Sequence, residues 1–526
     1  MKRILTCLVL CVFVLDEGFC CEYRNGTLQP VQRKMCEFKM KHPKPIGVLT
    51  TTAGRPVELR EIVTLNSDLL GNEYLLDSMM HLTHERVPER IVHAKGTAAF
   101  GYFQVTHDIS KYTKADVFNG IGKKTPLVAR FSTADQNLGG PDVVRELKGM
   151  AIKMYTKEGN LDFLCLQTPV YLYTDPLYFQ TQVHSFKRNP ATNVFDRTVT
   201  WDFLTTRPSG LHAFLWTQSD FGIPRSYRNI DGFPIQTYEL NNRKGERYYV
   251  RFNFRTEQGV RNLTEVGVTN ASQDIDYYTR DLYNAIASKN YPSWRLEMDV
   301  MTSEGIKHLD FNPFDVTRLW KNGTYHTVQI GRLTLNKNPD NYFKIAELSA
   351  FNPANLVPGI PGPPDTLFKG RRLFYRDTQN YRLGINHNKI DVNLPMYAKT
   401  YVRDGVPPVN ENMRDAPNYY PNSHSGPEPV VDESKPWRHL VVFEYNTVDL
   451  APPAYFYNHV LSDEGQRQRL AEALAAQLAT VTQPVQRRSL KMLTLIDKDL
   501  GRRVRHAVKV ATANNAKQLR HASESE

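Results

Sequence analysis

Short runs of β-branched and aromatic residues recur along the chain between about Ile91 and Asn341. Turn residues such as Lys244-Gly245 and Glu158-Gly159-Asn160 separate these runs. Runs of this length, bounded by turn residues, are typical of β-strands. We therefore expect an antiparallel sheet that curls into a barrel. The runs span Thr97 to Thr106, Leu127 to Phe131, Met150 to Tyr155, Tyr248 to Phe254, Leu296 to Met301 and Val328 to Leu335.

Helical patterns lie on both sides of this region. The stretch from about Tyr74 to Arg86 predicts a helix, and Pro88 stops it because proline cannot continue a helix. Ser462 to Thr480 predicts a second helix, with apolar residues at helical spacing and polar residues placed to cap its start. The apolar residues are Leu470, Leu474 and Leu478, and the capping residues are Asp463 and Gln466. This helix opens a small helical domain.

The length of 526 residues exceeds the usual size of a single hydrophobic core, and the apolar content of 41% is enough to fill more than one region. A stretch rich in Pro and Asn between Pro353 and about Pro436 indicates a long connection across the molecule. We expect a signal peptide over residues 1–20, an N-terminal arm over 21–90, a β-barrel core over 91–341, a wrapping connection over 342–436, and a C-terminal helical domain with a basic tail over 437–526.

The N-terminus is typical of a secretory signal. Lys2-Arg3 precede the apolar run Ile4 to Leu15, and small residues favour cleavage at about Cys20-Cys21. The run is too short to span a membrane, and no later segment approaches 18 uninterrupted apolar residues. We therefore expect a secreted, extracellular protein with no transmembrane segment. Sequons for N-glycosylation occur at Asn25, Asn262, Asn270 and Asn322.

Cysteine usage indicates no disulfide framework. After removal of the signal peptide only Cys21, Cys36 and Cys165 remain. A bridge between Cys21 and Cys36 and a pair of unpaired thiols are equally compatible with the sequence.

The formal net charge is +11, and much of the basic charge lies near the C-terminus. Such a run can bind acidic glycans or a membrane surface, and the alternative is a solvated helix face. The sequence resembles no nucleic-acid-binding module, so we expect no nucleic-acid partner. The basic residues are Arg487, Arg488, Lys491, Arg502, Arg503, Arg505, Lys509, Lys517 and Arg520.

One pair of residues carries specific chemistry. In a helix, Arg371 and Tyr375 are four residues apart and lie on one face. A guanidinium near a phenol favours the phenolate, and a phenolate is a strong ligand for ferric iron. Tyrosine is among the few axial haem ligands that proteins use. The alternative is an amphipathic helix with a buried Tyr375 and a solvated Arg371.

Several segments resemble the haem catalase family, in the family's order, from about Val48 to about Leu478. They are Val92-His93-Ala94-Lys95-Gly96, Gly101-Tyr102-Phe103, Arg130-Phe131-Ser132-Thr133, Lys187-Arg188-Asn189-Pro190, Tyr291-Pro292-Ser293-Trp294, Asn312-Pro313-Phe314-Asp315 and Asn418-Tyr419-Tyr420-Pro421-Asn422-Ser423. The resemblance implies an α+β haem catalase fold with an eight-stranded antiparallel β-barrel, an N-terminal arm, a wrapping connection and a C-terminal helical domain. It also implies haem b, hydrogen peroxide as substrate and a homotetramer with interwoven arms.

The same resemblance assigns the site. His93 matches the distal histidine that moves a proton between the peroxide oxygens, and Ser132 matches the serine that orients it. Tyr375 matches the ligand of the haem iron, with Arg371 beside it. The propionate-binding arginines correspond to Arg90, Arg130 and Arg382, and the apolar residues against the haem correspond to Val92 and Phe179. Surface ion pairs and core packing are the alternative roles for these five residues.

The sequence departs from the family on the distal side. Leu166 stands where catalases carry the asparagine that orients peroxide, and leucine cannot donate a hydrogen bond. Cys165 replaces a small residue, and Gln167 replaces a second asparagine whose amide can substitute if the loop shifts by one residue. We therefore expect reduced turnover.

A second departure concerns the dinucleotide that some catalases bind. His212, Ser219 and Arg255 suit phosphate and ribose, but Phe221 stands in place of an arginine and Asn322 in place of a histidine. We expect no NADPH.

Three hypotheses on function follow. The first is an extracellular catalase that converts hydrogen peroxide to water and oxygen. The second is a catalase-fold peroxidase or a hydroperoxide-converting haem enzyme, although Val92 argues against lipid hydroperoxides because such relatives tend to carry threonine beside the histidine. The third is a secreted haem-binding protein with little catalase activity, which Leu166 favours and the retained His93 and Ser132 disfavour.

Overall fold

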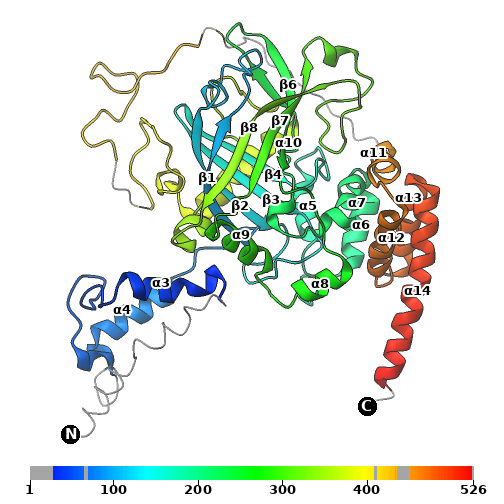
Figure 1. Cartoon of the computed structure of the whole chain (residues 1–526), viewed down its shortest axis with the longest axis horizontal. Helices are drawn as coiled ribbons and strands as arrows, with labels where there is room; N and C mark the ends of the chain where they lie inside the picture. Colours follow the sequence, from blue (N-terminus) through cyan, green and yellow to red (C-terminus); the bar gives the residue numbers. More distant parts are fainter. Residues whose placement is uncertain (1–27, 64–68, 408–411, 433, 435–448, 524–526) are drawn as a thin grey trace. The chain divides into compact units, whose positions relative to one another are not determined.

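The computed structural model describes residues 28–63, 69–407, 412–432, 434 and 449–523 (Figure 1). Its contacts divide the chain into two units, one formed by residues 1–88 with 283–288 and one formed by the rest. The expected signal peptide, Cys21 and the sequon at Asn25 lie outside the described residues. In the part of the chain that is described, no helix is long and apolar enough to cross a membrane.

The N-terminal unit contains the first expected helix. Helix α4 starts after Asn72, whose side chain accepts a hydrogen bond from the Leu75 amide at 2.9 Å. The helix ends four residues before the expected Arg86, because the side chains of Thr83 and His84 form hydrogen bonds with the Met80 carbonyl. The helical elements of this unit are η2 (Pro30–Arg33), α3 (Lys34–Lys41), η3 (Leu59–Ile62), η4 (Leu69–Gly71) and α4 (Glu73–Leu82).

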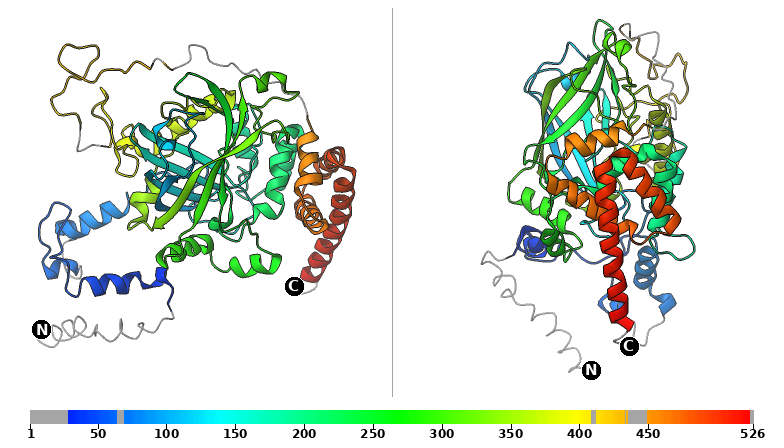
Figure 2. Two further views of the ribbon diagram at one scale, coloured as in Figure 1. Left: turned by 45° about the horizontal axis from the view of Figure 1, so that its top comes forward. Right: turned by 90° about the vertical axis from the view of Figure 1, so that its right-hand side faces the viewer.

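The second unit contains the expected eight-stranded antiparallel sheet, in the order β4-β3-β2-β1-β8-β7-β6-β5. The strands curl around a common axis (Figure 2). Isolated bridges from Leu166 to Phe233 and from Gly232 to Phe254 connect β4 with β6 through an intervening segment. The strands are β1 (Gly96–Val105), β2 (Lys124–Thr133), β3 (Lys148–Thr156), β4 (Gly159–Leu166), β5 (Tyr238–Asn241), β6 (Arg247–Thr256), β7 (Ser293–Thr302) and β8 (His326–Lys337).

All six runs expected as strands form strands, but β4 and β5 carry no clear strand pattern. Strand β4 has a charged residue, Asp162, at a fully buried position. Strand β5 is only four residues long and contains Glu239 and Asn241. Short or charged strands escape a pattern based on apolar residues.

Aromatic side chains fill the inside of the barrel. The ring of Phe163 on β4 lies 5.0 Å from that of Phe252 on β6, with the two rings edge to face. Phe118 contacts both Phe103 on β1 and Phe252, at 5.8 and 6.0 Å. Side chains alternate between the two faces of a strand, so the neighbours of these residues point outward.

A buried ion pair joins the outer face of the barrel to the wrapping connection. Lys153 on β3 and Asp162 on β4 lie 2.7 Å apart, and neither side chain is exposed. Asp162 also accepts hydrogen bonds from the Asn352 amide at 2.9 Å and from Asn355 Nδ2 at 2.8 Å. The ring of Phe351 lies under the Lys153 ammonium. This pair therefore fixes residues 351–355 against the sheet.

The helices of the second unit form a layer beside the barrel and a C-terminal domain. Helices α12, α13 and α14 pack on one another, and α12 and α13 also contact α7 and α6 through a shared hydrophobic core. The helices after β4 are α5 (Tyr178–Ser185), α6 (Arg197–Thr206), α7 (Leu211–Gln218), α8 (Glu265–Ala271), α9 (Tyr277–Ala287), α10 (Thr366–Leu383), α11 (Ala451–Tyr455), α12 (Glu464–Leu478), α13 (Gln483–Ile496) and α14 (Lys498–Ser523).

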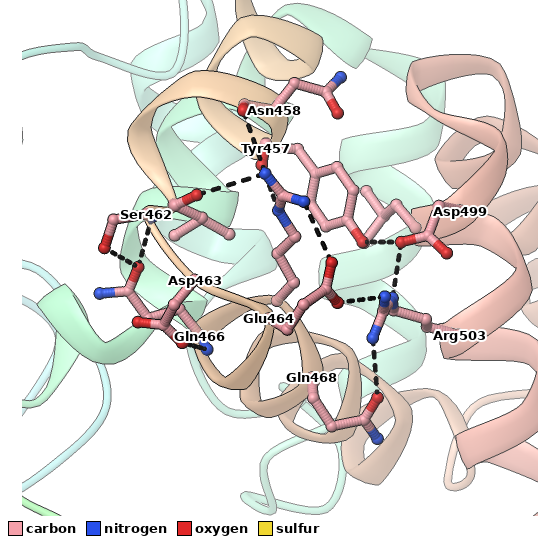
Figure 3. Close-up of polar contacts among 12 residues, drawn as sticks. Tyr457, Asn458, Ser462, Asp463, Glu464, Gln466, Gln468, Asp499 and Arg503 are labelled. Carbon is pink, nitrogen blue, oxygen red and sulfur yellow. Dashed lines mark hydrogen bonds and ion pairs between the residues drawn. The ribbon is translucent and has the colours of Figure 1, made fainter.

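The start of α12 has the expected cap (Figure 3). Asp463 accepts a hydrogen bond from the Gln466 amide at 2.8 Å, and Gln466 accepts one from the Ser462 amide at 2.7 Å. Arg503 on α14 bonds to Glu464 and to Asp499, which ties the first turn of α12 to α14. Part of the basic charge near the C-terminus is thus neutralised within the domain.

We expect Asp162→Ala to lower the free energy of unfolding by about 3–5 kcal/mol, because it leaves Lys153 buried and unpaired. Asp391→Ala is the matched control, since its pair with Lys344 is exposed and should contribute no more than about 1 kcal/mol. Urea unfolding followed by tryptophan fluorescence measures both losses. Equal midpoints for the two variants would contradict the role of the buried pair.

Candidate functional site

A cavity of about 400 Å³, which we call the central cavity, lies between the outer face of the barrel and α10. All nine residues that the sequence predicts for the site line it. They come from the segment before β1, from β2, from α5 and from α10: Arg90, Val92, His93, Arg130, Ser132, Phe179, Arg371, Tyr375 and Arg382.

One row of residues across four strands forms the wall around His93. Register pairs Gly96 with Ser132, Ser132 with Gly149, and Gly149 with Leu166. A Cβ atom at Gly149 would lie 2.8 Å from Ser132 Oγ and 2.9 Å from His93 Nδ1. Only glycine at this position therefore leaves room for the imidazole. The row places Leu166 beside it, as the sequence predicts.

His93 is held by its backbone and by Ser132. Its φ of 63° lies in the left-handed region, where residues other than glycine are uncommon. Its amide donates to the Ala134 carbonyl at 2.8 Å, and its Nδ1 lies 3.0 Å from Ser132 Oγ. The contact to Ser132 occupies Nδ1, so Nε2 is the ring nitrogen left for chemistry.

The surroundings of His93 disfavour the imidazolium. Burial, and then the charges of Arg130 and Arg90, lower the pKa of His93 to about 3. Arg130 donates to the His93 carbonyl at 2.8 Å and to the Ala94 carbonyl at 2.9 Å, so this positive charge is fixed close to the ring. A neutral imidazole can accept a proton from a substrate.

Three guanidinium groups lie near one carboxylate, Glu347, at the edge of the central cavity. Glu347 lies 2.9 Å from Arg382 and 3.4 Å from Arg90. Burial lowers the pKa of Arg90, Arg130 and Arg382, and the charge of Arg130 lowers the other two further. The Nε atom of Arg130 is buried without a hydrogen-bond partner among the described residues. This excess of positive charge fits a ligand with carboxylate groups.

The expected iron ligand lies on α10. Asp365 caps this helix by accepting the Phe368 amide at 2.8 Å, and Arg371 and Tyr375 share its inner face. The Arg371 guanidinium lies 5.4 Å from the centre of the Tyr375 ring and donates to Gln236 at 2.6 Å. Burial opposes the charge of Arg371, yet the Tyr375 phenol raises the pKa of Arg371. Arg371 is therefore buried and interacts with the half-buried Tyr375, so the alternative of a solvated Arg371 is wrong.

The amide of Gln167 does not replace the missing asparagine. Its Oε1 accepts the Lys148 amide, and its Nε2 donates to the Glu146 carbonyl at 3.2 Å. Strands β3 and β4 pair without a shift up to Leu166, so Gln167 remains on the opposite face. Leu166, which the sequence resemblance assigns to the position of the family's asparagine, lines the central cavity.

A second cavity of about 250 Å³, which we call the side cavity, shares five lining residues with the central cavity: Val92, His93, Leu166, Tyr171 and Phe179. Asp135 and Glu146 also line it. Burial and the charge of Glu146 raise the pKa of Asp135 to about 7. The side cavity thus places two acidic groups next to the residues around His93.

Sequence reasoning missed several residues of this site. Gly149 carried a signal, because an isolated glycine inside a strand suggests the close approach of another group. Glu347 and Gln236 carried none, since each is far in sequence from the arginines that it contacts, and Tyr171 carried no signal of its own.

Four of the five residues at the family's dinucleotide site contact other groups of the protein itself. His212 Nδ1 lies 2.6 Å from the Thr317 carbonyl, and Arg255 pairs with Asp231 and Glu297. The Phe221 ring packs on Trp216, whose other neighbour is Phe456 of the C-terminal domain. Ser219 Oγ donates to the Trp216 carbonyl, and Asn322 is exposed.

The arrangement suits a flat cofactor with carboxylate groups and a metal ion. The arginines can hold the carboxylates, the Tyr375 oxygen can bind the metal, and apolar side chains can cover the faces. Phe179 and Phe374 stack at 4.7 Å across the cavity. These rings must separate if a flat group is to lie between them.

Comparisons with known proteins agree with this geometry. The family profile described as Catalase matches residues 50–426, and that of the Catalase-related immune-responsive family matches residues 452–508. A catalase of Glandirana rugosa is 42% identical over 485 residues, covering 90% of this chain and 92% of that protein. A catalase of Mus musculus is 41% identical over 514 residues, covering 94% and 97%. The structure of catalase A from Saccharomyces cerevisiae superposes with a TM-score of 0.83 at 32% identity, covering 88% of this chain and 99% of that one.

We expect the imidazole of His93 to remain neutral down to about pH 4 in the chain without ligand, because its pKa falls to about 3 from an ordinary value of 6.5. Nitrogen NMR of histidine-labelled protein, with His93→Gln to assign the signal, measures this directly. The unfolded chain binds this proton at higher pH, so His93 makes the fold less stable as the pH falls below about 6.5. Titration of the His93 signal near pH 6.5 would rule out the effect of burial and of the arginines.

Proposed function

The chain belongs to the haem catalase family, and we propose that it is a secreted catalase whose turnover is reduced by Leu166. As a haem catalase it decomposes hydrogen peroxide to water and oxygen. The observation that carries the proposal is the His93 and Ser132 pair at 3.0 Å beside an apolar Leu166. The pair supplies the proton transfer, and Leu166 removes the second polar group of the distal side.

We assign the haem contacts as follows. Arg90, Arg130 and Arg382 would bind the propionates, which would balance the excess of positive charge around Glu347. Tyr375 would bind the iron, and the adjacent Arg371 would stabilise the anionic ligand. Val92 and Phe179 would pack against the cofactor. The cofactor is haem b, and when bound it supplies an iron that exchanges electrons with peroxide.

His93 moves the proton of the reaction. Its Nε2 accepts a proton from one peroxide oxygen and returns it to the other, so that the O–O bond breaks with release of water. Ser132 orients the ring by its contact with Nδ1. The positive charges that lower the pKa of His93 are those that bind the propionates. Haem binding therefore makes His93 a better base.

Leu166 explains a slower reaction rather than a different one. In this family an asparagine donates a hydrogen bond to peroxide, and removing such a donor typically costs about 10² to 10³ in rate. The Gln167 amide is committed to the backbone of β3 and of the preceding residues. The proton step at His93 does not depend on this donor. We therefore favour a slow catalase over a haem-binding protein without activity.

The remaining parts of the proposal concern the setting of the enzyme. Secretion rests on the N-terminal signal, and the sequons at Asn270 and Asn322 lie on exposed residues. A basic groove lined by Arg487, Lys491 and Arg505 is the place at which acidic glycans would bind. NADPH would not bind, since the groups suited to it are paired within the chain.

A homotetramer is supported by the N-terminal unit. Monomeric proteins rarely expose many large apolar residues close together. Several such side chains are more than two-fifths exposed in this unit: Met35, Phe38, Met40, Ile46, Val48, Leu49, Leu59, Ile62, Leu69, Leu70 and Met80. In a tetramer with interwoven arms, other subunits would cover them.

We expect Leu166→Asn to raise oxygen evolution per haem by at least about tenfold, since the restored donor contributes in the transition state. The full chain is purified from the culture medium, and oxygen is recorded after addition of hydrogen peroxide. Leu164→Asn is the matched control, because it adds an amide to the central cavity two residues away. An equal rate in wild type and Leu166→Asn at equal haem content would contradict the role of Leu166. No oxygen from either form would contradict the proposed function.

We expect Tyr375→Phe to lose haem or to shift the ferric absorption spectrum, because the benzene ring offers the iron no oxygen ligand. Tyr381→Phe, in the same helix and 77% exposed, is the control and should keep the wild-type spectrum. Haem content and absorption spectra of the purified variants measure the effect. An unaltered spectrum in Tyr375→Phe would show that another residue binds the iron.

A further inference from the structure

Three tyrosines form a chain of contacts that begins at the central cavity. Tyr171 lines both the central and the side cavity, and its hydroxyl lies 3.2 Å from that of Tyr173. The two rings are 4.9 Å apart, edge to face. Tyr173 is buried, and its ring is 6.3 Å from that of the half-buried Tyr178. The exposed Arg207 lies 4.9 Å above Tyr178, so the chain reaches the surface.

Packing alone does not require these hydroxyl groups. The same hydrophobic core contains phenylalanine at positions 179, 186, 203 and 214. A buried hydroxyl costs free energy unless it is hydrogen-bonded, and the hydroxyls of Tyr171 and Tyr173 are close enough to bond to each other. Burial raises the pKa of both phenols, so both are protonated at neutral pH.

Phenols are among the side chains that lose an electron most readily. The loss releases the hydroxyl proton, which the reduction of peroxide to water takes up, and the Tyr173 hydroxyl at 3.2 Å can then give an electron and a proton together to the oxidised Tyr171. An electron can cross between adjacent rings in short steps, whereas one long step from the surface to the cavity is slow. The geometry therefore offers a path for single electrons between the surface at Tyr178 and the cavity at Tyr171.

We propose that Tyr171, Tyr173 and Tyr178 carry single electrons from phenolic donors at the surface to the haem site, which gives the enzyme a one-electron peroxidase activity. This rests on the proposed function, because hydrogen peroxide must first oxidise the haem site. The donors are phenols that are too large to enter the side cavity. They bind near Tyr178 and Arg207 and react without reaching the haem.

The reaction balances without a further oxidant. Hydrogen peroxide takes up two electrons and two protons and yields two molecules of water. Each phenolic donor loses one electron and one proton and becomes a phenoxyl radical, so two donors replace the second peroxide of the catalase reaction. Each relay tyrosine loses one electron and one proton and regains both, and it is unchanged after the cycle.

The test uses the haem-loaded full chain mixed with peroxyacetic acid, frozen within milliseconds and examined by electron paramagnetic resonance. Peroxyacetic acid oxidises the site but does not return electrons as a second hydrogen peroxide does. We expect a tyrosyl radical, identified by narrowing of the signal in protein with ring-deuterated tyrosine. The signal should be lost in Tyr171→Phe. In Tyr178→Phe it should persist, while oxidation of a bulky phenol such as a tyrosine-containing peptide is lost.

The matched control is Tyr102→Phe, because the Tyr102 ring also lies under a cation, Lys124, but does not line either cavity. It should keep both the radical and the phenol oxidation. A radical of equal intensity in Tyr171→Phe would overturn the proposal, as would unchanged phenol oxidation in Tyr178→Phe. Oxygen evolution from hydrogen peroxide without any tyrosyl radical would overturn the relay alone. No oxygen and no change of the haem spectrum would overturn the proposed function itself.

Discussion

One row of paired residues across four strands determines the distal side of the site. Gly96, Ser132, Gly149 and Leu166 occupy successive positions of this row. A side chain at Gly149 would occupy the space of the His93 ring. The Ser132 hydroxyl orients the imidazole, and Gly149 leaves the room that the ring needs. A slip of one residue between strands would turn these side chains to the other face. The hydrogen-bond register of the barrel is therefore a condition for the chemistry.

The next rows on the same outer face serve the cofactor and the fold. Arg130 belongs to the second row, and the pair of Lys153 and Asp162 belongs to the third. Arg130 directs positive charge at the cavity. Asp162 holds the wrapping connection at Asn352, with Glu347 shortly before this point in the chain and α10 after it. Both devices place charge in a buried position, and each needs a partner to be stable. The fold supplies the partner of Lys153 and one carboxylate, Glu347, for the arginine cluster, and under the proposed function the haem propionates would supply the further negative charge.

The sequence predicts the parts of this structure that are coded locally. Six strands follow from apolar and β-branched runs, and the cap of α12 follows from Asp463 and Gln466. The family motifs identify the nine residues around the central cavity. The spacing of these residues along the sequence does not by itself show that they lie together. Strand β4 escapes prediction because its charge is neutralised by Lys153 on a neighbouring strand. Glu347 escapes for the same reason, since only the folded chain brings it to Arg90 and Arg382.

The change at Leu166 and the tyrosine chain have linked consequences. In a fast catalase the second peroxide returns electrons to the haem site before slower donors can compete. Under the proposed function, the apolar Leu166 beside His93 weakens the orientation of peroxide, and the oxidised site would then persist for longer. Tyr171 lines the same part of the cavity as Leu166, and its path to the surface is built from adjacent rings. A slower reaction with peroxide therefore favours electron supply through the protein. The change at Leu166 and the tyrosine chain thus support the same proposal.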